Sequence, residues 1–139
     1  MYICGMKNLG LLIIVLFALS SCNKANKEIR ERITNSDSVA INYFSGDGTI
    51  DTVVAIKVIK DSQKMEQLVN YIAARSNEGN YTCGFDGSLH FFKMNKVIQD
   101  IDFRMNEKGC MYFTFVLDGK SQATTLSPEA KELINSFRK

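Results

Sequence analysis

The stretch of residues 110–117, CMYFTFVL, decides the fold of this chain. Apolar side chains occupy every second position from Met111 to Leu117, which is the period of a β-strand with two different faces. The stretch 97–105 alternates in the same way, with charged side chains on its second face. Neighbouring strands with one dry and one wet face are typical of an antiparallel sheet.

Further strands are predicted on both sides of this pair. The stretches 89–94 and 120–125 alternate as well, and short connections such as Asp118-Gly119 suit hairpin turns. Two earlier strands, 39–44 and 50–59, are separated by a turn at Gly46-Asp47-Gly48. In the second of them one face is apolar and the other mixed; the apolar face comprises Ile50, Thr52, Val54, Ile56 and Val58.

Two helices complete the pattern. Asp61 is placed to cap the first, in which apolar residues recur at helical spacing from Met65 to Ala73. Ser127-Pro128-Glu129 has the residues of a second helix start. The order is ββαββββα. It predicts an α+β fold, an antiparallel sheet of five or six strands with two helices packed on one face.

Composition limits the class of protein. The chain has 139 residues, 45% of them hydrophobic and 23% charged, which suits a single globular domain. Its formal net charge of +2 provides no strong attraction for nucleic acid. We therefore expect no nucleic-acid partner.

The N-terminal segment has the layout of an exported leader. Lys7 supplies a positive charge, residues 9–19 are apolar, and the small residues Ser20 and Ser21 precede Cys22. The apolar run is shorter than the ~20 residues that span a bilayer as a helix. Met6 is a cleaner start than Met1, and either start remains open.

Leu19-Ser20-Ser21-Cys22 resembles the lipobox of bacterial lipoproteins. The resemblance implies cleavage before Cys22 and attachment of acyl chains, such as palmitate, to its thiol. More than one chain anchors a protein stably. The resemblance also implies that Asn23, in place of Asp, directs the protein to the outer membrane. Whether the domain faces the periplasm or the cell surface stays open.

The chain is thus divided into three parts. Residues 1–21 are the signal peptide, 22–37 the lipidated Cys and a polar tether, and 38–139 one α+β domain. Within the tether only Ile29 and Ile33 could pack, and the spacing of Glu28 and Arg32 allows one or two turns of helix. An exported compartment permits disulfides, so Cys83 and Cys110 are expected to form a bridge. Two buried free thiols are the alternative.

Few residues suit catalysis. A nucleophilic Cys83 would need His90, the single His of the chain, as its base, whereas a disulfide would exclude this dyad. Asp100 and Asp102 lie two residues apart on one strand face, as paired carboxylates do in glycosidases, or simply as a solvated face. No cofactor or metal site is expected, because a zinc site needs more ligands at suitable spacing.

The remaining candidate is a binding patch on the outer face of the sheet, made of His90, Phe92, Tyr112 and Thr114. The expected function is a membrane-tethered, non-catalytic module that binds a protein or peptide of the envelope. The alternatives are an envelope enzyme using Cys83/His90 or Asp100/Asp102, and a structural envelope component.

Overall fold

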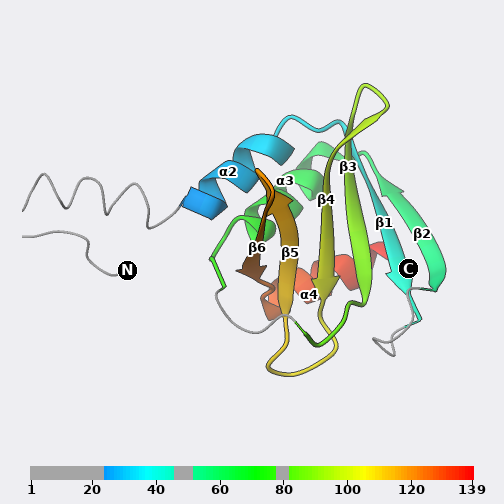
Figure 1. Cartoon of the computed structure of the whole chain (residues 1–139). Helices are drawn as coiled ribbons and strands as arrows, with labels where there is room; N and C mark the ends of the chain where they lie inside the picture. Colours follow the sequence, from blue (N-terminus) through cyan, green and yellow to red (C-terminus); the bar gives the residue numbers. More distant parts are fainter. Residues whose placement is uncertain (1–23, 46–51, 78–81) are drawn as a thin grey trace, which may run out of the picture.

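The structure, a computed structural model, describes residues 24–45, 52–77 and 82–139. A six-stranded antiparallel sheet carries the helices on one of its faces (Figure 1). In chain order the elements are α2 (Lys24–Ile33), β1 (Ser38–Phe44), β2 (Val53–Ile59), α3 (Ser62–Ile72), β3 (Gly87–Lys93), β4 (Lys96–Arg104), β5 (Tyr112–Leu117), β6 (Lys120–Thr125) and α4 (Pro128–Phe137). The α+β class and the antiparallel sheet are confirmed. The calls on the leader, the lipobox and Cys22 lie outside the described residues.

The strands follow the order β2-β1-β3-β4-β5-β6. From β3 onward each strand pairs with the next along the chain, and tight hairpin turns join β3 to β4 and β5 to β6. In the first turn Met94 and Asn95 have φ angles of 53° and 66°, as a two-residue hairpin turn of the right twist requires. The sheet therefore has two edges, β2 and β6.

The core lies between the sheet and the helices. Alternate residues of each inner strand face it, among them Ile41, Leu89, Ile101 and Phe113, all fully buried. Gly87 belongs to this face for a steric reason. A Cβ added there would lie 2.3 Å from the Asn42 carbonyl oxygen and 2.4 Å from the Phe103 ring, so the packing of β3 excludes any larger residue.

The structure has three helices in its described residues, not two, and the order is αββαββββα. The expectation of a polar tether over 22–37 is wrong from Lys24 onward, because Ile29 and Ile33 of α2 are fully buried in the core. The Asn26 side-chain amide also donates to the Ala73 carbonyl at 3.1 Å. Two apolar residues four positions apart suffice to dock a short helix where the rest of the core already offers a surface.

In β2 the more apolar face points away from the core. Ile59, Lys57 and Ala55 lie opposite the buried residues of β1, so Ile56 and Val58 lie on the outer face. Ile56 is 62% exposed. The turn at 46–48 and Ile50 lie outside the described residues. The pairing register with β1 decides which face of β2 points to the core. The buried Val39, Ile41 and Tyr43 of β1 set this register, and it overrides the apolar pattern of β2 itself.

Candidate functional site

The helices leave the outer face of the sheet uncovered over most of its area (Figure 1). His90, Phe92 and Thr114 of the predicted patch lie on this face and are half-buried. Tyr112 also belongs to this side of the sheet, but it is only 1% exposed. The predicted accessible position on the outer face is therefore correct for His90, Phe92 and Thr114 and wrong for Tyr112.

Tyr112 is buried because a chain segment crosses over it. Its hydroxyl donates to the Gly84 carbonyl at 3.1 Å, and the Phe85 ring packs edge-on against it with the centroids 6.1 Å apart. Gly84 has a φ of 82°, a left-handed conformation that glycine adopts without strain. Residues 82–86, which we call the covering segment, close one end of the outer face.

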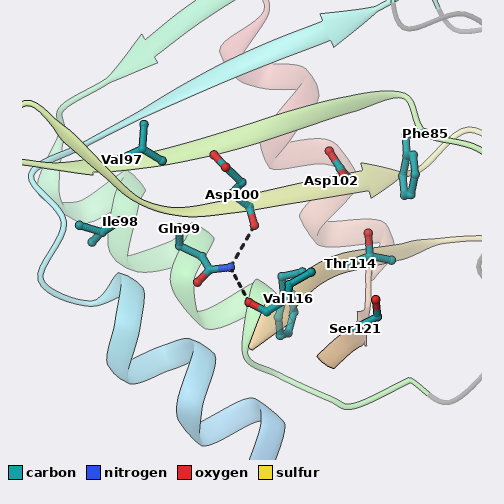
Figure 2. Close-up of a pocket in the computed structure, with 10 residues that line it drawn as sticks. Phe85, Val97, Ile98, Gln99, Asp100, Asp102, Thr114, Val116 and Ser121 are labelled. Carbon is teal, nitrogen blue, oxygen red and sulfur yellow. Dashed lines mark hydrogen bonds between the residues drawn. The ribbon is translucent and has the colours of Figure 1, made fainter. Parts of the chain in front are cut away.

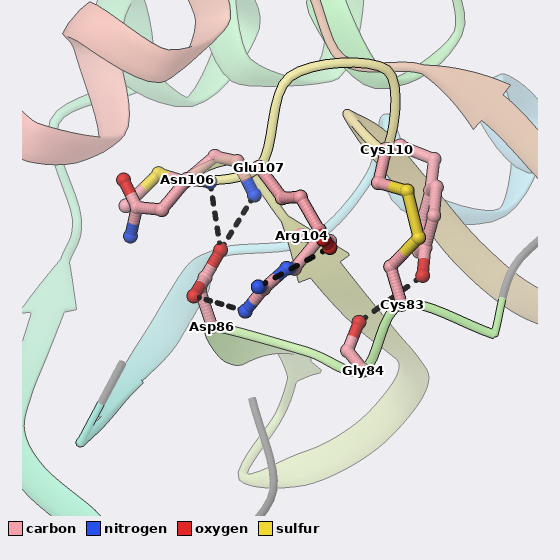
Figure 3. The surroundings of a disulfide bond; sticks show 9 residues. Cys83, Gly84, Asp86, Arg104, Asn106, Glu107 and Cys110 are labelled. Carbon is pink, nitrogen blue, oxygen red and sulfur yellow. Dashed lines mark hydrogen bonds and ion pairs between the residues drawn. A yellow bond between two sulfur atoms is a disulfide. The ribbon is translucent and has the colours of Figure 1, made fainter. Parts of the chain in front are cut away.

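A disulfide between Cys83 and Cys110 holds the covering segment to the start of β5, with the two Cα atoms 6.2 Å apart (Figure 3). The predicted bridge is confirmed. The Cys83/His90 dyad is wrong, since the Cys83 sulfur is bonded and cannot act as a thiolate nucleophile. The Glu107 carboxylate lies within 4.8 Å of both sulfurs, but disulfide sulfurs are not thiolate ligands for a metal.

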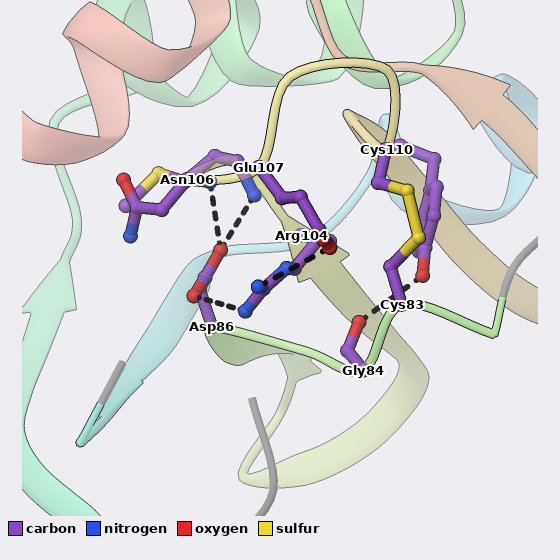
Figure 4. A network of polar contacts seen from close by, with 9 residues as sticks. Cys83, Gly84, Asp86, Arg104, Asn106, Glu107 and Cys110 are labelled. Atoms are coloured by element: carbon purple, nitrogen blue, oxygen red, sulfur yellow. Dashed lines mark hydrogen bonds and ion pairs between the residues drawn. A yellow bond between two sulfur atoms is a disulfide. The ribbon is translucent and has the colours of Figure 1, made fainter. Parts of the chain in front are cut away.

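A buried ion pair holds the other end of the covering segment (Figure 4). The Arg104 guanidinium donates to one oxygen of Asp86 at 2.9 Å. The second oxygen of Asp86 accepts the backbone N–H groups of Met105 at 2.7 Å and Asn106 at 2.9 Å. These three hydrogen bonds to one carboxylate compensate for the removal of its charge from water.

The uncovered part of the outer face has a groove between β4 and β5 (Figure 2). The two strands pair only from Asp102↔Thr114 to Arg104↔Tyr112, and beyond this point they diverge. The Gln99 amide bridges the opening by donating to the Val116 carbonyl at 3.4 Å. The hollow measures about 540 Å³. Its lining comprises Phe85, Val97, Ile98, Gln99, Asp100, Asp102, Thr114, Phe115, Val116 and Ser121.

The groove combines apolar and acidic side chains. Val97 and Val116 are about half exposed at its two sides, and Ile98 is an extra residue of β4 where the register with β3 shifts. Asp100 and Asp102 add two carboxylates along the β4 side. This lining can accept a ligand that carries apolar groups together with positive charge or hydrogen-bond donors.

His90 is held in a polar network beside the groove. Its Nδ1 lies 2.6 Å from the Asp100 carboxylate, while its Nε2 lies 3.1 Å from the Ser88 hydroxyl and 3.2 Å from the Asn42 amide nitrogen. The contacts follow the order serine, histidine, carboxylate, as in hydrolytic triads. However, Ser88 is only 6% exposed, and Nε2 is shared with Asn42. The network therefore links β1, β3 and β4 and does not present a nucleophile.

A second hollow of about 450 Å³ lies between α2 and α3. Ile33, Met65 and Val69 contribute apolar surface, and the Arg30 guanidinium donates to the Asn70 side chain at 2.6 Å across the two helices. Its charged residues alternate in sign around the opening. It is separate from the predicted patch, so we take the groove between β4 and β5 as the candidate site.

Sequence reasoning missed the groove and the residues that form it. The signal was Gln99. This polar residue lies in the core-facing row of β4, whose other members include the apolar Ile101 and Phe103. A buried amide in an apolar row must have partners, and here they are the neighbouring Asp100 carbonyl at 3.1 Å and the Val116 carbonyl of the diverging strand at 3.4 Å. The position of β5 relative to β4 cannot be read from a single strand.

Comparison with known proteins adds little. No family model matches the chain, and no solved structure matches it. A segment of 106 residues is 29% identical to an invertase of Debaryomyces hansenii, covering 72% of this chain and 19% of that protein. The chain spans about a fifth of the length of that relative. Among the described residues, no helix has the length and apolar character needed to cross a membrane.

Proposed function

We propose that this chain is a small lipid-anchored protein of the bacterial envelope whose uncovered sheet face binds an extended protein segment. The anchor follows from the lipobox-like residues 19–22. Since α2 begins at Lys24, an acylated Cys22 would hold the domain close to the bilayer and not on a long tether. The outer membrane remains the expected location.

The observation that supports binding is the groove between β4 and β5. It lies on a face that the helices leave bare, and Val97 and Val116 border it beside Asp100 and Asp102. Half-exposed aliphatic side chains on an otherwise ordered face are typical of a partner site. The matching ligand is an extended segment in which apolar residues alternate with Lys or Arg, since those charges suit the two carboxylates.

A photo-crosslinking experiment in the native envelope tests the binding site. A benzophenone amino acid replaces Val116 in the groove, and in the control chain it replaces Glu132, an exposed residue of α4 on the helix side. We expect light-dependent adducts at position 116 that a second change, Val97→Lys, lowers several-fold. Equal adducts at positions 116 and 132 would contradict the proposal.

The anchor is tested separately. The unchanged chain should incorporate labelled palmitate and sediment with membranes, whereas Cys22→Ala should lose the label and leave the membrane fraction. Labelling of the Cys22→Ala chain, or an unchanged chain that stays on membranes without lipid, would rule out the anchor and leave the groove unaffected.

An envelope enzyme is the second candidate, because Asp100 and Asp102 line the same groove and one similar protein is named an invertase. Sugar hydrolysis needs one protonated and one ionised carboxyl group on opposite sides of the bond. Release of reducing sugar from sucrose, abolished by Asp102→Asn, would favour this function. An equal background with both proteins would exclude it.

A further inference from the structure

We propose that the edge strand β2 pairs with β2 of a second copy of this chain, in an antiparallel arrangement with its two-fold axis at Ile56. The groove between β4 and β5 is separated from β2 by β1 and β3. This pairing therefore goes beyond the proposed binding function and does not rest on it.

The two edge strands of the sheet differ in whether another segment of the chain pairs with them. At β6, Asn77 donates its backbone N–H to the Ala123 carbonyl at 2.9 Å, and Thr125 donates to the Arg75 carbonyl at 2.8 Å. The chain after α3 thus covers the second half of that edge, at residues 123–125. Among the described residues β2 pairs only with β1, so one row of its backbone donors and acceptors faces outward.

The side chains of β2 favour a strand partner over water. Ile56 and Val58 on the outer face are 62% and 57% exposed. At the other end of the strand, the bulge residues Val53 and Val54 are about half exposed. β-Branched residues are those most favoured in paired strands. Proteins usually protect an exposed edge with charges, proline or bulges; β2 carries one charge, on Lys57, and its bulge lies at the first two residues, so residues 55–59 stay regular and mostly uncharged.

The sequence of β2 complements itself in one register. With Ile56 opposite its own copy, Val54 lies opposite Val58. Lys57 lies opposite Ala55, so no two like charges are directly opposed. Residues 54–58 are paired in this register, and the two sheets join into one; the bulge places Val53 on the outer face while Ile59 faces the core, so pairing ends before them. A second copy of this chain always supplies this complementary strand, which is why it is the favoured occupant.

Cysteine crosslinking of the full chain tests the register. In an opposed pair the two Cβ atoms lie about 4.5–5.5 Å apart, so Ile56→Cys should form a disulfide with its own copy under mild oxidation. The matched controls are Val116→Cys, an equally exposed apolar position on β5, and Val58→Cys, which faces Val54 and not itself. We expect at least about tenfold more dimer on a non-reducing gel for Ile56→Cys than for either control.

A mass measurement on the purified full chain in detergent provides the second readout. Sedimentation of the unchanged protein should show twice the chain mass, and Ile56→Lys should raise the dissociation constant at least about tenfold because two charges meet at the axis. Val116→Lys should leave the mass unchanged. Crosslinking at Ile56→Cys no greater than at Val116→Cys, a monomeric unchanged chain, or an adduct of another mass would each overturn the proposal.

Discussion

The outer face of the sheet has a closed end and an open end, and the same kinds of residue behave differently in the two. At the closed end Tyr112 and Arg104 are buried beneath the covering segment, although both have polar groups. At the open end Val97 and Val116 are exposed, as is Ile56 on the edge strand β2, although all three are apolar. Burial on this face is thus decided by a segment that a disulfide and an ion pair hold in place, and not by residue type.

Asp86→Ala should have the largest effect on this contrast. It leaves the buried Arg104 guanidinium with only the Glu107 carboxylate, at 3.4 Å, and removes the acceptor of two backbone N–H groups. Breaking a buried pair in this way costs about 3–5 kcal/mol of unfolding free energy. Urea unfolding followed by circular dichroism measures it, with Asp61→Ala, a change at an exposed helix cap, as a milder control. A loss below that of the control would contradict the role of Asp86.

The double change Cys83→Ser with Cys110→Ser should come next. In the chain-entropy model, a bridge between residues 27 positions apart contributes about 3–4 kcal/mol to the free energy of unfolding. We expect a lower urea midpoint together with faster hydrogen exchange at residues 82–86. If exchange is unchanged there while the midpoint falls, the bridge stabilises the fold without holding the covering segment.

The two buried tyrosines, one on each face of the sheet, predict that the free energy of unfolding falls at alkaline pH, by less than in the two variants above. Burial raises the pKa of Tyr43, on the helix side, from 10.0 to about 12, and burial beneath the covering segment also raises the pKa of Tyr112. Between pH 10 and 12 the unfolded chain loses the Tyr43 proton while the folded chain keeps it, so stability falls as the pH rises. The loss attributable to Tyr43 is about 2–3 kcal/mol by pH 12.

Tyr43→Phe should flatten this alkaline decline, and Tyr112→Phe should flatten it further. Urea midpoints measured from pH 8 upward give the slopes. The same decline in the unchanged chain and in both variants would show that other groups cause it.

Val116→Ser at the open end should change stability least, by less than about 0.5 kcal/mol, because the side chain is already 55% exposed. Phe113→Ala, on the same strand but facing the helices, should cost about 3–5 kcal/mol. Urea unfolding of both variants gives the comparison. A large loss for Val116→Ser would mean that the open end is covered in the folded protein.

Much of the fold could be predicted from the chain because its signals are local. Alternation in 97–105 and 110–117 reports a strand with two different faces, and the residues around Ser127 report a helix start. Helix α2 was interpreted as a tether with at most two helical turns, because its two buried isoleucines are a weak signal until a surface exists for them to pack on. The groove was missed because Gln99 reveals an opening only when the position of β5 is known.

By itself, the sequence determined the antiparallel α+β class and the approximate strands, favoured the bridge between Cys83 and Cys110 over two free thiols, and placed His90, Phe92 and Thr114 on the outer face. These follow from periodicity and from residue chemistry within short stretches. Only the tertiary structure decided that Tyr112 is covered, that the apolar face of β2 is exposed, and that β4 and β5 diverge. Each of these depends on which distant segment lies alongside, and a strand's own pattern does not contain its neighbours.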